Sequence, residues 1–229
     1  MQFHRYALYF TPPAGPFSDF ACSWLGWDMQ SGQPVAHPDI PCLPAPVGEI
    51  TQIPRKYGLH ATIKPPFRLA EGRTADDLKA AMSAYCQTRC AIVLDGLNLA
   101  QLGRFLALVP NGNTSSLNTF SADVVREFDT FRAPSTAAEL DRRRSNGMSD
   151  ALDANLRNWG YPYVMDAYRF HITLSGKLPK AQAATLRATL APMIEPLLPR
   201  PYVIDGLSLA GEDTAGQFHL IERHLFKET

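Results

Sequence analysis

Two similar stretches decide the fold of this chain: Tyr57-Gly58-Leu59-His60-Ala61-Thr62-Ile63 and Tyr168-Arg169-Phe170-His171-Ile172-Thr173-Leu174. Each places a histidine and a threonine two residues apart in an apolar, β-prone segment. Because successive side chains of a strand point to opposite faces, the histidine and threonine of each stretch share one face. Two such half-sites suit the chemistry of a phosphate ester, since one imidazole accepts a proton while the other donates one.

The surroundings of the two stretches also repeat. The first is followed by a predicted helix from Thr74 to Gln87, with a capping-box-like start, and then by an apolar run around Asp95-Gly96. The second is followed by a helix that Pro179 opens, and then by a run around Asp205-Gly206. The two histidines lie 111 residues apart and the two Asp-Gly pairs 110 apart. The chain is therefore a tandem duplication.

The repeat extends upstream. The strand expected at 5–10 resembles the one expected at 104–109, and each precedes a probable helix, at 17–25 and at 117–128. Each half thus reads β-α-β-α-β. We expect an α+β fold, a single bilobal domain over 1–229 with lobes of about 1–110 and 104–229. Related by a pseudo-twofold axis, the lobes would bring both histidines to one cleft.

The paired apolar-His-x-Thr strands of a duplicated chain resemble the 2H (two-histidine) phosphoesterase superfamily, which includes the RNA 2′-5′ ligase-like (LigT-like) proteins and the cyclic nucleotide phosphodiesterases. Three longer stretches resemble one branch of it, described as phosphonate-metabolism proteins: 57–67, Phe131-Arg132-Ala133-Pro134 and Trp159-Gly160-Tyr161-Pro162-Tyr163. The resemblance implies antiparallel sheets around a central cleft, helices outside and a cyclic-phosphodiesterase-like hydrolase.

Strand alternation adds candidates to each half-site. On the face of His60 it places Lys64, and on the face of His171 it places Arg169 and Ser175. Lys64 and Arg169 are candidate phosphate contacts because each brings a positive charge. Tyr9, on the expected cleft side of the first strand, and Ser175 are further candidate substrate contacts.

The predicted mechanism uses four side chains. His60 and His171 are the catalytic acid and base, since imidazole titrates near pH ~6.5, and the sequence leaves open which does which. The hydroxyls of Thr62 and Thr173 would donate to the non-bridging phosphate oxygens. No carboxylate–histidine cluster suggests a metal, so we expect a metal-independent reaction with no cofactor.

Composition restricts the partners. The formal net charge is zero, so no global field recruits nucleic acid, although a local basic cleft stays open. We find neither a signal-like N-terminus nor a run of roughly 20 apolar residues, and the four cysteines lack paired CxxC spacing. We expect a cytoplasmic protein with a small phosphorylated substrate, no membrane partner and no stable nucleic-acid partner. Oligomeric state is not indicated.

Two insertions interrupt the repeat. One is a proline-rich connection over 32–54, and the other a pair of helices, from a capping box at Thr136 to Arg144 and from Ser149 to Gly160. Both either rim the cleft or form packing surface. Within the second, Arg142-Arg143-Arg144 is either a solvated helix end or a contact for a distal phosphate of the substrate.

Three functional hypotheses follow. The leading one is a phosphodiesterase acting on a small cyclic phosphate or nucleotide phosphodiester, with a ribosyl cyclic phosphate from phosphonate breakdown as a candidate. The second is an RNA end-processing or 2′-5′ ligase-like enzyme acting on short RNA ends, which would favour a longer basic track. The third is a non-catalytic phosphate-ester-binding protein.

Overall fold

The computed structural model describes residues 2–144 and 147–227. Its strands are β1 (Arg5–Phe10), β2 (Trp27–Asp28), β3 (Gln33–Pro34), β4 (Ala61–Phe67), β5 (Ile92–Leu94), β6 (Leu97–Leu102), β7 (Phe105–Pro110), β8 (Ile172–Thr173), β9 (Tyr202–Ile204), β10 (Gly206–Glu212) and β11 (Phe218–Leu225). Its α-helices are α1 (Pro16–Leu25), α2 (Val47–Ile50), α3 (Gln52–Arg55), α4 (Ala75–Cys86), α5 (Ser115–Glu127), α6 (Ala137–Arg143), α7 (Asp150–Trp159) and α8 (Lys180–Ile194). Short 3₁₀ helices lie at Phe128–Phe131, Met165–Ala167 and Glu195–Leu197.

Seven strands form one sheet in the order β11-β10-β1-β4-β8-β7-β6, and every neighbouring pair is antiparallel. Apart from β11, the order is symmetric about the β4–β8 junction, where the two His-x-Thr stretches meet. The repeats also exchange strands, because β6 of the first pairs with β7 of the second, and β10 of the second with β1 of the first. The equivalent strands β5 and β9 pair with each other. The predicted α+β class with antiparallel sheets is confirmed.

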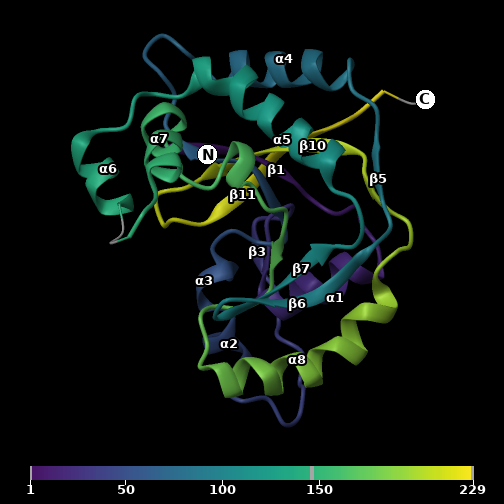
Figure 1. The fold of residues 1–229 in the computed structure, drawn as a ribbon. Coiled ribbons are helices and arrows are strands. Elements are labelled where there is room, and N and C mark those ends of the chain that lie inside the picture. The colour runs from purple at the N-terminus through teal and green to yellow at the C-terminus, as the bar shows by residue number, and fades with distance from the viewer. Residues whose placement is uncertain (1, 145–146, 228–229) are drawn as a thin grey trace.

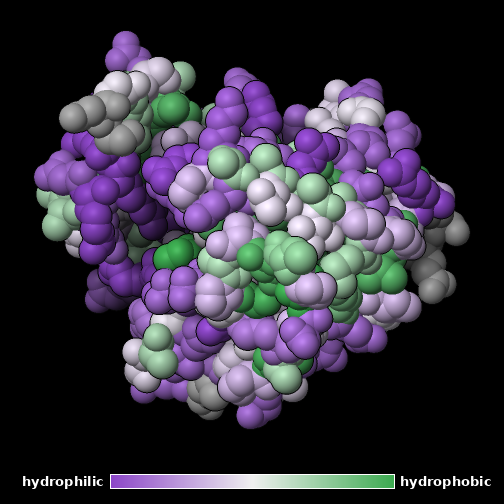
Figure 2. Space-filling model, turned by 90° about the horizontal axis from the view of Figure 1, so that it is seen from below, coloured by the Kyte–Doolittle hydropathy of each residue, from purple (hydrophilic) through white to green (hydrophobic). Residues whose placement is uncertain are grey.

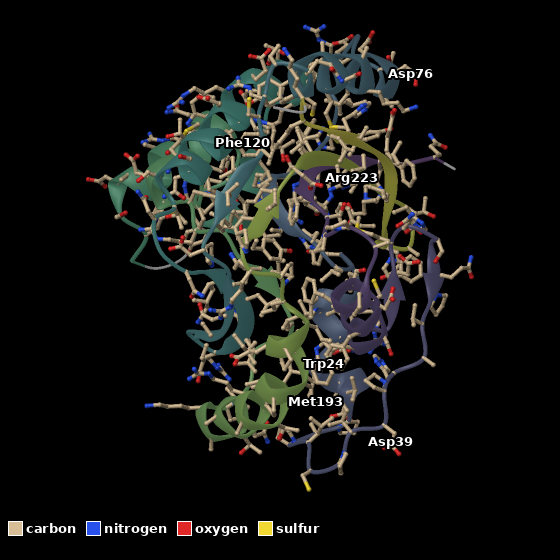
Figure 3. The ribbon with its side chains drawn as sticks, turned by 90° about the vertical axis from the view of Figure 1, so that its right-hand side faces the viewer. Trp24, Asp39, Asp76, Phe120, Met193 and Arg223 are labelled. Carbon is tan, nitrogen blue, oxygen red and sulfur yellow. The ribbon has the colours of Figure 1, made fainter. Side chains whose placement is uncertain are left out.

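Four long helices cover one face of the sheet, α4 and α5 above and α1 and α8 below in Figure 1. Their sequences explain this, since α4 buries Leu78, Met82, Tyr85 and Cys86 at helical spacing, and α8 buries Ala183, Leu186, Leu190 and Ile194. The main core lies between these helices and the sheet. Figure 3 shows Trp24 of α1 and Phe120 of α5 in its lower and upper parts.

The opposite face of the sheet carries a smaller apolar cluster: Ala7, Tyr9, Ala210 and Phe218 from β1, β10 and β11, and Trp27 and Met29 from the β2–β3 hairpin. The indole nitrogen of Trp27 donates to the carbonyl of Phe218 at 2.9 Å. This cluster lies beside one half of the β4–β8 junction. It makes the two halves of this face unequal.

The proline-rich connection is ordered by packing. Ile40, Leu43 and Val47 pack against the main core. The Arg55 guanidinium holds the segment, because it donates to the carbonyls of Leu25 (3.1 Å) and Gly48 (2.7 Å).

The predicted helices at 17–25, 74–87, 117–128 and 179–194, and the capping box at Thr136, are confirmed within one or two residues. The apolar run around Asp95-Gly96 is broken into β5 and β6, where Gly96 has φ +149. The C-terminal strand β11 was not predicted from the sequence. Across the part of the chain that the model describes, we find no helix with the length and apolarity to cross a membrane.

Candidate active site

The β4–β8 junction brings the two half-sites together. Ala61 of β4 pairs with Ile172 of β8. Continued by one residue in each direction, this antiparallel register sets His60 opposite Thr173 and Thr62 opposite His171. Side chains opposite one another in an antiparallel pair share a face. The two histidines and two threonines therefore form one four-residue cluster, which we call the His-Thr cluster.

Both imidazoles are oriented by the same backbone contact. His60 Nδ1 lies 3.0 Å from the carbonyl of Gly58, and His171 Nδ1 lies 2.8 Å from the carbonyl of Arg169. A carbonyl only accepts, so each Nδ1 must carry a proton, which leaves Nε2 as the nitrogen that can exchange protons with a ligand. The Thr62 hydroxyl, 3.2 Å from His60 Nε2, donates to it when that nitrogen is unprotonated.

Gly58 makes the His60 contact feasible. Its φ of +68 lies in the left-handed region, and a Cβ there would come within 3.0 Å of Met29 and 3.3 Å of Trp27. Both constraints favour glycine. The turn before β4 and the β2–β3 hairpin are therefore packed tightly next to the imidazole.

His60 is crowded by aromatic rings. The Tyr9 ring lies 4.0 Å from the imidazole, centroid to centroid, and the Tyr57 ring 5.9 Å away. The pKa of His60 is lowered to about 4, mainly by burial and less by the charge of His171, against the opposing effect of the Gly58 contact. His60 is therefore neutral at neutral pH.

Tyr9 lies on the face of the His-Thr cluster, since it is the strand partner of Thr62. Its side chain is fully buried, and among the residues described its hydroxyl has no hydrogen-bond partner. Burial raises the pKa of this phenol well above 10, and Tyr57 and Glu212 add to the effect. Its contact with substrate stays a prediction.

His171 has a more open setting, with the Phe105 ring 5.9 Å away. Arg169 is exposed, and its guanidinium donates to the carbonyls of Asp166 (3.0 Å) and Tyr168 (2.6 Å). The proposed contact between Arg169 and a phosphate stays a prediction.

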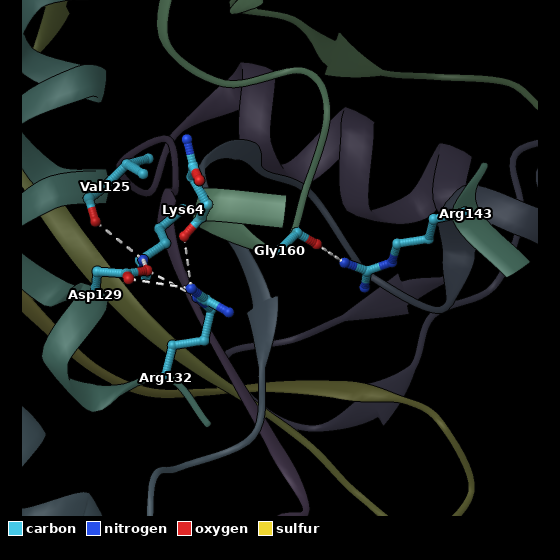
Figure 4. Close-up of polar contacts among 7 residues, drawn as sticks. Lys64, Val125, Asp129, Arg132, Arg143 and Gly160 are labelled. Atoms are coloured by element: carbon cyan, nitrogen blue, oxygen red, sulfur yellow. Dashed lines mark hydrogen bonds and ion pairs between the residues drawn. The ribbon is translucent and has the colours of Figure 1, made fainter. Parts of the chain in front are cut away.

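Lys64 does not share the face of His60, so that prediction was wrong. Tyr9 pairs with Thr62 but Leu8 pairs with Lys64, which marks a β-bulge that shifts the alternation by one residue. Because Leu8 faces the main core, Lys64 is turned there too and is 1% exposed. Its Nζ donates to the Val125 carbonyl (3.0 Å) and to Asp129 (3.2 Å) (Figure 4). Burial lowers its pKa to about 8.

The same bulge recurs after Thr173, so the prediction that Ser175 shares the face of His171 was also wrong. The carbonyl of Leu106 accepts from both Leu174 N (2.9 Å) and Ser175 N (3.3 Å). The Ser175 hydroxyl accepts from Leu106 N and donates to the Gly176 carbonyl, each at 2.9 Å, and the residue is 1% exposed. Pleat alternation holds from each histidine to its threonine and fails directly afterwards.

Arg5 also lies on the face of the His-Thr cluster, a position that we did not predict as functional. It alternates with Ala7 and Tyr9 along β1 and pairs with Glu212. Arg5 lines a pocket of about 60 Å³ together with residues of α6 and the segment Trp159-Gly160-Tyr161. The signal for Arg5 was present in the same alternation that identified Tyr9.

Comparisons with known proteins place these features in a family. The family model described as "Protein of unknown function (DUF1045)" matches residues 62–219 of this chain. A protein of Janthinobacterium sp. (strain Marseille) named "Ribose 1,5-bisphosphate phosphokinase PhnN" is 38% identical over 93% of this chain, and one of the same name from Laribacter hongkongensis (strain HLHK9) is 32% identical over 93%. The matches cover 48% and 49% of those proteins, so the chain spans about half their length.

Solved structures are similar over nearly the whole chain but only distantly. The "Crystal structure of phosphoesterase" is 14% identical, covers 99% of this chain and all of its own, and has a TM-score of 0.41. The "Crystal structure of E.coli LigT complexed with ATP" is 12% identical with the same coverage and a TM-score of 0.42.

Proposed function

The chain belongs to the protein family DUF1045, and we propose that it is a phosphoesterase that opens a small cyclic phosphodiester by two-histidine acid–base catalysis. One observation carries the proposal. The antiparallel β4–β8 register sets each histidine opposite the threonine of the other repeat, and both imidazoles turn Nδ1 toward the backbone. Two proton carriers and two hydroxyl donors thus lie together on one face of the sheet.

The settings of the histidines favour a division of roles. His60, which is neutral because burial lowers its pKa, acts as the base and accepts a proton from water on Nε2. The water oxygen forms a bond to phosphorus while the bond to the leaving oxygen breaks. His171, protonated in the active form, donates a proton from Nε2 to that leaving oxygen.

The threonines hold the phosphate. Without substrate, the Thr62 hydroxyl donates to His60 Nε2. A non-bridging phosphate oxygen would take over this hydrogen bond and free Nε2 to accept a proton. Thr173, opposite His60 across the junction, would donate to the other non-bridging oxygen, and donors placed before the reaction stabilise the charge that develops.

The names of the relatives support a sugar phosphate as substrate. They refer to a kinase of ribose 1,5-bisphosphate. The present sequence has no Gly-x-x-x-x-Gly-Lys-Ser/Thr loop, the usual phosphate loop of such nucleotide-binding domains. We therefore infer that this half of those proteins acts on a related metabolite, and that the substrate is a ribosyl cyclic phosphate in phosphonate metabolism.

A substrate screen tests the proposal. Cyclic phosphates of ribose and of nucleosides, and short 2′-5′-linked RNA, would be incubated with the wild type, His60→Ala and His171→Ala, with and without EDTA. We expect hydrolysis of a small cyclic phosphate that survives EDTA and is lost in both variants. Preference for RNA would favour the end-processing alternative. Loss of ligand affinity with full turnover retained would show that the histidines only bind.

A further inference from the structure

The three stretches that resemble the phosphonate-metabolism branch meet around one pocket that the proposed chemistry does not use. Its wall includes Lys64, Pro65, Pro66 and Phe67 from the first stretch, Arg132 and Ala133 from the second, and Trp159, Gly160 and Tyr161 from the third. Figure 2 shows the hollow at the left, between the projection that carries α6 and the body of the molecule.

The pocket is strongly cationic in a chain whose formal net charge is zero. Among the residues that the structure describes, six basic side chains and one carboxylate line it: Arg5, Lys64, Arg68, Arg132, Arg142 and Arg143 against Glu139. Just outside the lining, Asp129 forms ion pairs with both Lys64 and Arg132 (Figure 4). Glu212 forms an ion pair with Arg5. Even with these carboxylates, an excess of about three positive charges remains in the pocket.

Arg142 and Arg143 supply most of this excess. Neither forms an ion pair within the described ranges 2–144 and 147–227. Arg143, half-buried at the end of α6, donates to the carbonyl of Gly160, and its guanidinium lies 5.6 Å from the centre of the Tyr161 ring. These contacts hold the guanidinium in place without neutralising it, which suits an anion-binding group.

The pocket adjoins the His-Thr cluster along one strand face. Arg5 and Tyr9 alternate on the same face of β1, four residues or roughly 13 Å apart between Cα atoms. The Tyr9 ring contacts His60. The charge of Arg5 lowers the pKa of the Tyr9 phenol, and Tyr161 raises it. Tyr9 therefore stands between the two sites on one face of β1.

We propose that this pocket binds a second, terminal phosphate of the substrate, through Arg143 and Arg142 with Arg5 at its inner edge. The inference rests on the proposed function and refines it. The substrate class becomes a cyclic phosphodiester that carries a phosphate monoester at its far end. The monoester dianion matches the excess positive charge, whereas an unphosphorylated cyclic ester would leave that charge unmatched.

Binding of inorganic phosphate tests the pocket without any turnover. The His60→Ala/His171→Ala protein lacks both imidazoles of the His-Thr cluster. Calorimetric titration of this protein with phosphate therefore measures the affinity that the arginines of the pocket provide. Adding Arg142→Gln and Arg143→Gln should weaken phosphate binding roughly 10- to 100-fold. Arg187→Gln, an exposed arginine of α8, is the matched control and should change nothing. Equal phosphate affinities in all three proteins would overturn the proposal that the pocket binds phosphate, provided that thermal unfolding shows each protein to be folded.

A pair of substrates tests its role in recognition. We would compare kcat/KM for adenosine 2′,3′-cyclic phosphate with and without a 5′-phosphate. The wild type should favour the 5′-phosphorylated form by about 10-fold or more, and this ratio should fall toward 1 in Arg143→Gln but not in Arg187→Gln. Hydrolysis of both forms at a ratio near 1 in the wild type would overturn the subsite and leave the proposed function standing. Arginine-dependent phosphate binding without hydrolysis of any cyclic phosphate would overturn the proposed function and leave the phosphate-binding pocket standing.

Discussion

His60 and His171 occupy equivalent positions in a duplicated fold, yet their surroundings differ at one strand position. Tyr9 is the strand partner of Thr62, and Ala107 is the strand partner of Thr173. The tyrosine lies over His60 and contributes to the burial that lowers its pKa to about 4, whereas the alanine leaves His171 without a matching aromatic cover. Duplication thus produces two equal half-sites, and a neighbouring strand makes them chemically unequal.

Removing either imidazole should have the largest effect. His60→Ala and His171→Ala are each expected to lower kcat/KM by about 10²- to 10⁴-fold, because each removes one proton transfer. The double variant should lose far less than the product of the two, since the pair acts as a unit. Steady-state kinetics on the substrate found by the screen measures this. Fully multiplicative losses would mean that the histidines work independently.

The threonines should matter less, and equally. Thr62→Ala and Thr173→Ala each remove one hydroxyl donor to the phosphate, for an expected loss of about 10- to 10³-fold in kcat/KM. The corresponding serine variants keep a hydroxyl and should recover most of the activity. A loss at Thr62 alone would show that the half-sites differ in phosphate binding as well as in proton transfer.

Tyr9→Leu tests whether the aromatic cover makes the half-sites unequal. Opening His60 to solvent should raise its pKa from about 4 toward its usual ~6.5. The acidic limb of the pH profile of kcat/KM should then move to higher pH by about one unit or more. Tyr9→Phe keeps the ring and is the control, with an unchanged limb. If the acidic limb does not move in Tyr9→Leu, Tyr9 is not the cause of the lowered pKa of His60.

His60 should also make stability depend on pH. Its pKa is lowered on folding, so between about pH 4 and 6.5 His60 is protonated in the unfolded chain and unprotonated in the folded chain. The free energy of unfolding should therefore fall as the pH falls through this window, by on the order of 1–3 kcal/mol from this group. Urea titrations of wild type and His60→Gln measure it, and the variant should show a flatter dependence.

Ser175→Ala should have the smallest effect on catalysis. Within the described part of the chain, the Ser175 hydroxyl bonds to the backbone at Leu106 and Gly176 and to no other group. We expect a loss of about 1 kcal/mol of stability and a change of less than about 3-fold in kcat/KM. A loss of kcat/KM as large as that of Thr173→Ala would show that Ser175 shares the face of His171 after all.

The sequence by itself determined what depends on local periodicity. The main helices and the pairing of each histidine with its threonine on one face follow from residues a few positions apart, whose directions the pleat and the helical turn set. The duplication follows from the recurrence of these local patterns in the two halves of the sequence. Tyr9 was placed on the cleft face in the same way. These features needed no knowledge of which strands become neighbours.

The tertiary structure decided everything that depends on a partner strand. The bulges that turn Lys64 and Ser175 to the core exist only against Leu8 and Leu106, and a one-residue bulge reverses a face without any local signature. The exchange of β6 and β10 between repeats brings Glu212 to Arg5. Three distant stretches surround one cationic pocket only because the chain folds them together, since charge and burial are properties of neighbours in space.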